Sequence, residues 1–489
     1  MTTRLNFPVV LRVQGWLQFI EAAFMLMPAA VSWYYDDMTS LLAFVVSSVI
    51  TAAAGLLMTM GLKPGNHAVM RRREGLLLTA IIWVFFSLFG MLPFLISGTL
   101  TTVTDAFFET MSGFTTTGAS VVTDIEALPR GILFWRAIMQ WIGGLGIILF
   151  TLAVIPMLNQ KGGIAMFNAE VTGITHERLR PRVSQTAKDL WLIYIILTAV
   201  MAVLLTRSLG WYDAVFHAMT TMATGGFSTR NAGLHYWNDY WVYGVVTAFM
   251  FVGGINFSII YSVVRGRFSR LRGNDTFKYY VAMMLIVSAV IFVNMTAEGY
   301  ASSTLDRVVF SLFDTVSAMS STGLATVDYE TRGEFIAMLL LVVIFFGGMA
   351  GSTSGGAKID RLIVLLKNTA NEFYRVLHPN TVTAVRVNGR VLSHTLVAKV
   401  IAFLAIYVMV MLVVALILTL FEVPIVDSIY TSLAMISNYG LGYGSTAAVD
   451  GFATLPCAVK WLLATEMLIG RLELFTVLVL FTPAFWRRD

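Results

Sequence analysis

The chain has 489 residues, of which 57% are hydrophobic and only 12% are charged, and its mean hydropathy is +0.77. A soluble domain of this size needs more charge on its surface, so the composition excludes one and indicates an integral membrane protein along its whole length. The net charge of +5 is accounted for by basic cytoplasmic loops and does not call for a nucleic-acid partner. The single cysteine, Cys457, excludes a disulfide within one chain and a cysteine metal site.

The N-terminal segment, residues 1–73, is predicted to form two transmembrane helices, at about 14–33 and 39–62. Each run is apolar and near the ~20 residues that span a bilayer. The stretch 63–73 ends in three arginines, so the positive-inside rule places it in the cytoplasm and the turn at 34–38 outside. The first run is long, carries Glu21 and is followed by another span, so it is not interpreted as a cleavable signal peptide.

The rest of the chain is predicted to consist of four repeats, each with a helix, a half-helix that returns as a strand, and a second helix. The predicted units are 74–187, 188–277, 278–392 and 393–489. The loops assigned to the inner side are basic, and most acidic loop residues fall on the other side. The pattern predicts an all-α polytopic protein of the plasma membrane with ten spans and both termini inside.

Residues 105–120 define the half-helix of the first repeat. They are too few to cross a bilayer and too apolar for a solvated loop, and they end in Thr115, Thr116, Thr117 and Gly118. Non-helical backbone at membrane depth is tolerated only where it is buried in protein or lines a watery cavity. A half-helix also directs the negative end of its dipole beyond its C-terminus, which attracts a cation.

The stretch recurs three times without gaps, at 213–228, 310–325 and 427–442, with a glycine in the same column each time. Glycine reaches positive φ without steric cost, so its carbonyl can turn inward. Four copies around one axis suit an ion filter made of backbone carbonyls. The candidate filter residues are Thr116, Thr117 and Gly118; Thr224, Gly225 and Gly226; Ser321, Thr322 and Gly323; and Asn438, Tyr439 and Gly440.

The second helices also share a column, which contains Gly144, Gly254 and Gly348 in the first three repeats and Arg471 in the fourth. A charge at that depth is costly and marks a candidate functional residue. The alternative is a buried structural contact of Arg471 with Glu466, Glu473 or a loop carbonyl, and the two interpretations are compatible. Three half-helices begin with an aspartate (Asp105, Asp213 and Asp427), which we interpret mainly as helix N-caps.

Residues 347–358 interrupt the second helix of the third repeat with five glycines and three hydroxyl residues, too many for a stable helix. A close-packing glycine face explains only part of this run. A phosphate-binding loop lacks its Gly-Lys-Ser/Thr ending and its preceding strand. The third interpretation is a flexible loop below the filter that blocks the path when it is closed and so acts as a gate. The candidate gate residues are Gly347, Gly348, Gly351, Ser352, Thr353, Ser354, Gly355, Gly356, Lys358 and Arg471.

From about residue 70 to its end, the chain resembles the TrkH/KtrB branch of the bacterial potassium uptake proteins. The most specific segments are 114–120, 140–148, 347–359, 378–390 and 467–487. The two extra N-terminal helices resemble the TrkH type more than the KtrB type. Because related plant transporters that prefer sodium carry serine at the first filter glycine, Gly118 favours potassium as the transported ion.

The resemblance further implies a gate at 347–358, with Arg471 near the pore below the filter. It implies a separate cytosolic regulator of the TrkA type that binds nucleotides, for which the basic loops 159–187 and 367–392 are the predicted docking surface. It also implies a homodimer in the lipid membrane with one pore per protomer. No bound cofactor is expected besides the transported K⁺.

The sequence contains no nucleotide-binding strand–loop–helix, no acid pair in a soluble domain and no nucleophile elbow, so an enzyme is not predicted. Two rival functions stay open. A proton- or sodium-coupled symporter would need a second ion site with buried carboxylates, for which Glu466 and Glu473 are the candidates. A non-conducting scaffold or sensor would have no reason to retain four matched filter stretches.

Overall fold

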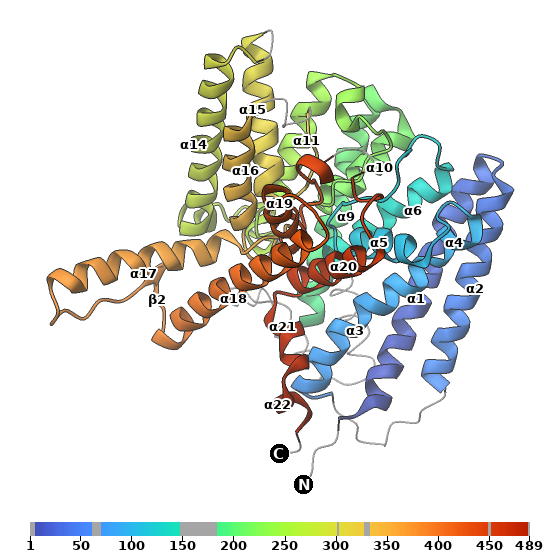
Figure 1. Ribbon diagram of the computed structural model, residues 1–489, viewed down its shortest axis with the longest axis horizontal. Coiled ribbons are helices and arrows are strands. Elements are labelled where there is room, and N and C mark those ends of the chain that lie inside the picture. The colour runs from blue at the N-terminus through green and yellow to red at the C-terminus, as the bar shows by residue number, and fades with distance from the viewer. Residues whose placement is uncertain are drawn as a thin grey trace.

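The computed structural model describes residues 5–60, 70–146, 183–300, 303–326, 333–447 and 451–487. These residues form an all-α protein, as predicted (Figure 1). The strands in the described part are two short ones, β1 (Arg386–Val387) and β2 (Arg390–Val391), which pair in an antiparallel hairpin. The helical fold is what apolar chains adopt in lipid, because a helix satisfies its own backbone hydrogen bonds.

The two N-terminal helices are α1 (Phe7–Tyr34) and α2 (Met38–Met60), close to their predicted bounds. They pack along each other beside the first repeat, on the right of Figure 1. The approach of the two helices is close, because a Cβ on Gly15 would lie 2.6 Å from the carbonyl oxygen of Gly55. The small residues therefore let two helix backbones meet, as is common between membrane helices.

Each repeat has a long first helix, a half-helix and a second helix. The first helices are α3 (Arg72–Gly90), α9 (Val183–Leu209), α14 (Asp275–Ala297) and α18 (His394–Thr419). The half-helices are α5 (Val103–Phe114), α10 (Trp211–Met222), α15 (Thr304–Met319) and α19 (Ile425–Ile436). The second helices are α6 (Arg130–Trp141), α11 (Tyr240–Gly253), α16 (Glu334–Phe346) and α20 (Cys457–Arg471). Helices α9 and α14 begin slightly before the boundaries predicted at 188 and 278.

The second helices of the last three repeats end at the shared glycine column and that of the first becomes π-helical there, whereas the sequence predicted a break only in the third repeat. Helix α6 passes into a π-helical turn, η1 (Ile142–Gly146), and α11 bends by 107° into α12 (Phe257–Val264). A Cβ on Gly143 would lie 1.8 Å from the carbonyl oxygen of Phe114, and one on Gly470 would lie 2.0 Å from that of Ile436. Glycine weakens the helix here and also lets it touch the end of the half-helix.

Six helical stretches in the described part are long and apolar enough to cross a membrane. They are α1, α2 and the first helix of each repeat. In the first repeat the stretch also includes α4 (Leu92–Ser97), which follows α3. The bent pair α11–α12 would make a seventh span. The second helices account for the difference from the ten spans predicted. Helices α11, α16 and α20 are each shorter than a full span, and the residues that follow η1 in the first repeat lie outside the described part.

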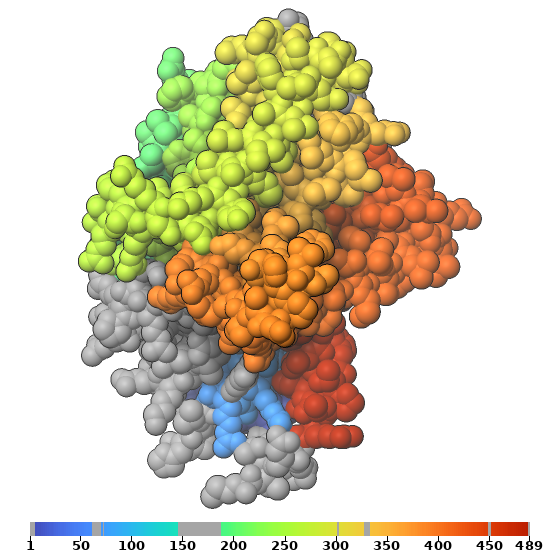
Figure 2. Space-filling model, turned by 90° about the vertical axis from the view of Figure 1, so that its left-hand side faces the viewer, coloured from blue at the N-terminus to red at the C-terminus, as the bar shows by residue number. Residues whose placement is uncertain are grey.

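Helix α17 (Ile359–Leu377) projects from the body of the molecule, beside the start of α18 and the β1–β2 hairpin (Figure 1). Its residues, in orange, stand at the centre of the face shown in Figure 2. The remaining short elements are α13 (Ser269–Arg272), α21 (Phe475–Leu478), α22 (Pro483–Trp486) and the 3-10 turns η2 (Gly233–Tyr236), η4 (Gly444–Thr446) and η5 (Val479–Phe481).

Candidate functional site: the ring of four re-entrant segments

The four candidate filter segments meet in a closed ring. Each segment contributes one glycine of the shared column, called here a ring glycine: Gly118, Gly226, Gly323 and Gly440. The ring glycine of one repeat lies against the carbonyl of the residue that precedes the ring glycine in the next repeat. The distances from an added Cβ to that oxygen are 2.1 Å for Gly118 to Gly225, 2.1 Å for Gly226 to Thr322, 3.7 Å for Gly323 to Tyr439 and 2.2 Å for Gly440 to Thr117. The fourth repeat thus returns to the first, and the structure brings together all the predicted filter segments.

The half-helices all end in the same hydrogen-bonded cap. In the first repeat, the amide of Thr116 donates to the Gly113 carbonyl at 3.0 Å and that of Thr117 donates to the Ser112 carbonyl at 2.9 Å. The other three repeats have the equivalent two bonds. This is a Schellman cap, which satisfies two carbonyls that would otherwise be free at the helix end. These two carbonyls are therefore paired within the half-helix and are not free to face an ion.

A Schellman cap needs a left-handed residue, and glycine is the usual choice. Here that position holds Thr116, Thr224, Ser321 and Asn438, with φ between 51° and 55°. The ring glycines two residues later also have positive φ, from 33° to 86°. A left-handed residue with a Cβ costs roughly 1–2 kcal/mol, and a β-branched one is a genuine outlier. This conformation recurs four times, twice on a β-branched threonine, and strain of this kind points to a functional site.

The side chains at the left-handed position are buried, and two of them carry oxygens without a hydrogen-bond partner in the described part of the chain. These atoms are Thr116 Oγ1 and Asn438 Oδ1. Asn438 uses its amide nitrogen to donate to Thr117 Oγ1 at 3.1 Å and to the Met467 carbonyl at 2.9 Å, which links the fourth repeat to the first. A buried oxygen without a donor is available to a cation.

The candidate gate segment 347–358 is not helical, as predicted, and connects α16 to α17. Its middle lies directly against the ring. The amide of Gly355 donates to the hydroxyl of Ser321, and a Cβ on Gly355 would lie 1.9 Å from the Ser437 carbonyl oxygen. The segment therefore contacts the ring segments of the third and fourth repeats.

The same segment is also tied to the break in the second helix of the second repeat. Thr353 donates its hydroxyl to the Gly253 carbonyl at 3.0 Å, and Asn256 donates to the Ala350 carbonyl at 2.6 Å. Asp360, at the start of α17, accepts the Ala350 amide at 2.7 Å. Lys358 is buried and donates to the Ser354 carbonyl. Gly347, Gly348, Gly351, Ser352 and Gly356 fall in the same non-helical turn.

Arg471 ends α20 and joins three parts of the molecule. Its guanidinium donates to the Thr353 carbonyl of the candidate gate segment at 2.8 Å and to the Gly143 and Gly144 carbonyls of the first repeat at 2.7 and 2.8 Å. The loop-carbonyl contact weighed in the sequence analysis is therefore present. The two neighbouring acids are used elsewhere: Glu473 pairs with Arg361 and Glu466 accepts from Ser432 at 2.6 Å.

The three repeat-defining aspartates are not N-caps, contrary to the prediction. Each is the third residue of its half-helix. Asp105 pairs with Lys460 at 2.6 Å, Asp213 accepts from the Thr229 hydroxyl at 2.7 Å, and Asp427 accepts from Ser445. Carboxylates in the first turn still interact favourably with the positive end of the helix dipole. These residues therefore anchor the half-helices at the end away from the ring.

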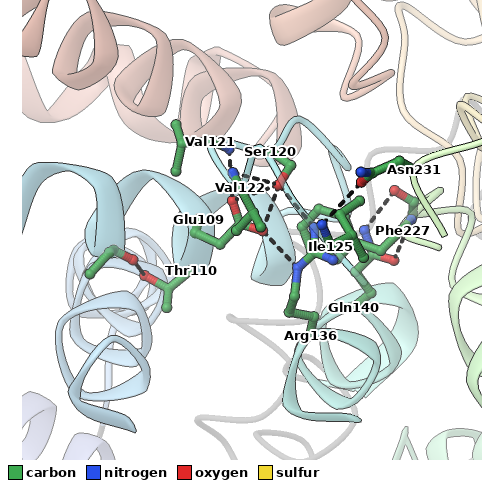
Figure 3. Close-up of polar contacts among 12 residues, drawn as sticks. Glu109, Thr110, Ser120, Val121, Val122, Ile125, Arg136, Gln140, Phe227 and Asn231 are labelled. Carbon is green, nitrogen blue, oxygen red and sulfur yellow. Dashed lines mark hydrogen bonds and ion pairs between the residues drawn. The ribbon is translucent and has the colours of Figure 1, made fainter. Parts of the chain in front are cut away.

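The sequence did not predict the polar residues behind the ring, chiefly Glu109, Arg136 and Gln140 (Figure 3). All three are buried, and Gln140 donates to the carbonyl of the ring residue Gly225 at 2.6 Å. The available signal was the presence of polar side chains in stretches that are otherwise apolar, which is costly inside a membrane. The basic loop predicted at 159–187 lies, up to residue 182, outside the described residues.

Comparison with known proteins places the whole chain. The family TrkH, described as a cation transport protein, matches residues 41–488. The chain is 33% identical to the Trk system potassium uptake protein TrkH of Salmonella typhimurium, over 99% of this chain and 100% of the relative. It is 35% identical to the protein of that name from Halomonas elongata, over 98% of this chain and 99% of the relative.

The fold agrees with that comparison. The crystal structure of the potassium transporter TrkH from Vibrio parahaemolyticus superimposes with a TM-score of 0.88, at 32% identity, over 99% of this chain and 100% of that one. The family is one of transporters and not of enzymes, which bears out the expectation that the chain is not an enzyme. The chain belongs to the TrkH family of cation transport proteins.

Proposed function

We propose that the protein takes up potassium across the bacterial inner membrane, and that the ring of four re-entrant segments is its selectivity filter. The observation that carries the proposal is the closed fourfold ring, in which each segment has the same left-handed pair of residues two positions apart. Backbone carbonyls turned toward one axis replace the hydration shell of an ion. The relatives' names as potassium uptake proteins support potassium as that ion.

The filter of this proposal is formed by residues 116–118, 224–226, 321–323 and 438–440. Their carbonyls are the main ligands. The buried oxygens of Thr116 and Asn438, which lack donors in the described part of the chain, add ligands on the side of the half-helices. The C-terminal ends of α5, α10, α15 and α19 add a favourable dipole. Pore repeats bounded at 74–187, 188–277, 278–392 and 393–489, after two N-terminal helices in 1–73, are part of the same proposal.

The gate of this proposal is the segment 347–358, held by Arg471. The support is its contact with the ring through Gly355 and with the second repeat through Thr353. Five glycines allow the segment to change conformation at low cost. In the conformation described, Arg471 clamps it by donating to the Thr353 carbonyl. Opening requires that this contact and the Gly355 contact be exchanged for others.

A cytosolic partner fits the relatives' names, which describe them as proteins of a Trk system. We assign this partner to the TrkA type, a nucleotide-binding regulator, docked on the basic surface of residues 367–392 together with the loop 159–187. Arg375 lies in the last turn of α17, the helix that begins where the candidate gate segment ends, and Arg386 lies in β1, where its carbonyl accepts from Lys367 of α17. A homodimer with both termini in the cytoplasm completes the proposal.

The test is potassium uptake in cells that lack their own potassium systems, with the TrkA-type partner present. We expect the wild type to restore growth at low potassium and Gly118→Ser to lose it or to admit sodium, because any Cβ on Gly118 meets the Gly225 carbonyl. Gly323→Ser is the matched comparison at an equivalent ring position. Its Cβ position lies 3.7 Å from the nearest atoms, so we expect it to be the less damaging of the two. A wild type that moves no potassium would overturn the proposal.

A proton- or sodium-coupled symporter is the alternative that remains, and it rests on the two acids of the fourth repeat. Glu473 is paired with Arg361, which leaves it without the free charge that a second cation site needs. Glu466 is buried and accepts from Ser432. Glu466→Gln distinguishes the two functions, because a symporter would lose its dependence on the coupling-ion gradient and a channel would keep potassium flux.

A further inference from the structure

Behind the ring, each half-helix carries one polar side chain that contacts the segment following the ring glycine of the same repeat. The residues occupy the same column: Glu109, His217, Asp314 and Thr431. Each of them contacts a hydroxyl of its own repeat. In the last three repeats, His217 contacts Ser228 Oγ at 3.0 Å, Asp314 contacts Thr326 Oγ1 at 3.0 Å and Thr431 contacts Thr446 Oγ1 at 2.8 Å. The column therefore braces each strand from the half-helix.

The first repeat has a more elaborate brace. Glu109 accepts the Val121 amide at 3.0 Å and the Ser120 hydroxyl at 3.1 Å. Arg136 on α6 donates to Glu109 at 2.7 Å and to Ser120 Oγ at 3.0 Å (Figure 3). Its guanidinium carbon lies 4.0 Å from the centre of the Phe227 ring, which belongs to the second repeat. Glu109 and Arg136 are 0% and 1% exposed, so the pair is fully desolvated.

One helical turn further along the same face of α6, Gln140 holds the second repeat. Its amide nitrogen donates to the Gly225 carbonyl at 2.6 Å, and its oxygen accepts the Phe227 amide at 3.2 Å. The Gly225 carbonyl is the atom that lies against Gly118. Arg136 and Gln140 thus fix the strands on both sides of one seam of the ring, between the first and second repeats.

No other repeat needs these side chains to fold. The residues aligned with Arg136 through the glycine column are Val246, Leu340 and Leu463, and those aligned with Gln140 are Met250, Ile344 and Met467, all fully buried. Replacing a buried ion pair with apolar side chains is often neutral or stabilising, so the pair is weak evidence of a need for stability. The planar guanidinium instead fixes several acceptors in one geometry.

We propose that Glu109, Arg136 and Gln140 are positioning residues that set the width of the ring at the seam between the first and second repeats, and so its preference for potassium over sodium. This inference rests on the proposed function. A carbonyl ring favours the larger ion only while its strands resist closing on the smaller one. Without the brace, the Gly225 carbonyl and the strand after Gly118 are free to shift, so sodium gains more than potassium.

The experiment measures potassium and sodium uptake side by side in the cells described above, with the amount of protein in the membrane quantified. Glu109→Gln and Arg136→Gln are expected to lower the potassium-to-sodium ratio on the order of tenfold, as do changes to residues that hold the ligands of a cation. Glu109→Asp keeps the carboxylate and is expected to have a ratio between that of Glu109→Gln and that of the wild type. Lys460→Gln is the matched control: it breaks another ion pair of α5, to Asp105, at the end of the half-helix away from the ring.

Single changes in a buried ion pair can prevent folding, so two milder variants carry the test as well. Gln140→Met installs the residue found at this column in the second and fourth repeats, and Ser120→Ala removes one hydroxyl while leaving both charges. A lower ratio in these variants, with the control at the wild-type ratio, supports the inference. A wild-type ratio in Gln140→Met and Ser120→Ala overturns it, whatever the uptake rate. A wild type that moves no potassium overturns the proposed function, and the inference falls with it.

Discussion

The guanidinium of Arg471 donates a 2.8 Å hydrogen bond to the carbonyl oxygen of Thr353, so the last residue of α20 holds the middle of the segment between α16 and α17. The same guanidinium reaches the carbonyls at the end of α6. One side chain therefore connects the fourth repeat, the candidate gate and the first repeat. A charge-assisted hydrogen bond is stronger than a neutral one, and removing it leaves buried carbonyls unpaired.

Loss of this clamp is expected to favour the open gate. Arg471→Ala removes all three donated bonds, and we expect it to raise potassium flux measured without the TrkA-type partner by roughly tenfold, since a hydrogen bond to a charged group contributes about 1.5–3 kcal/mol. Arg471→Lys keeps the charge but cannot reach all three carbonyls, so its flux should lie between that of the wild type and that of Arg471→Ala.

The measurement is rubidium uptake into liposomes that contain the purified protein alone. Lys399→Ala, which removes an exposed basic residue of α18, serves as the control for loss of a positive charge. Equal partner-independent flux in Arg471→Ala and the wild type, at equal protein content, would contradict the clamp.

The ring glycines are expected to differ in their tolerance of a methyl group. In Gly118, Gly226 and Gly440 a Cβ would lie 2.1–2.2 Å from a backbone oxygen of the neighbouring repeat, whereas in Gly323 nothing lies closer than 3.7 Å. Gly323→Ala should therefore cost only the left-handed backbone, roughly 1–2 kcal/mol. The other three alanine variants should shift the backbone of the ring as well and abolish selective uptake.

Thermal unfolding in detergent and the potassium-to-sodium uptake ratio, measured on all four alanine variants, check this order. The four positions are equivalent in the sequence alignment, so each variant is a control for the others. A Gly323→Ala variant as damaged as Gly118→Ala would show that the spacing between the third and fourth repeats is not wider than at the other three seams.

The sequence was sufficient for the number of repeats, the position of the half-helices and the glycine column, because each depends on a local pattern that occurs four times. It was not sufficient for the backbone at Thr116. Threonine disfavours the left-handed region, and only the cap formed with Ser112 and Gly113 imposes it. Tertiary structure overrides local preference at such a position.

The changes in the second helices at the glycine column outside the third repeat were missed for a related reason. A pair of glycines within an apolar run is compatible with a continuous helix, at a cost of about 1 kcal/mol each. The decisive fact is the approach of the Phe114 carbonyl to Gly143, which depends on the fold. The contacts of Arg471 and of Gln140 likewise join repeats that are far apart in the chain. Arg471 was recognised from the sequence as a candidate residue without its partners in the first repeat, and Gln140 was not recognised.

Thr116→Gly separates the two roles of the left-handed position, which are to form the cap of the half-helix and to place a side-chain oxygen near the ion. Glycine adopts this conformation without strain, and Thr116 Oγ1 has no hydrogen-bond partner in the described part of the chain that would be lost. We therefore expect the variant to unfold at the same temperature as the wild type or slightly above it. Because the proposal makes the threonine oxygen a ligand of the ion, the same variant should lower the potassium-to-sodium uptake ratio several-fold, although it is no less stable.

Thr116→Ser is the matched variant, because it keeps the oxygen and loses only the methyl group that makes the position β-branched. It should retain the wild-type ratio in the uptake assay. A Thr116→Gly variant that is stable and fully selective would show that the hydroxyl has no part in ion binding, and that the threonine is retained for another reason. The combination of unchanged stability and reduced selectivity is the result expected of a residue whose strain is maintained because its side chain contacts the ion.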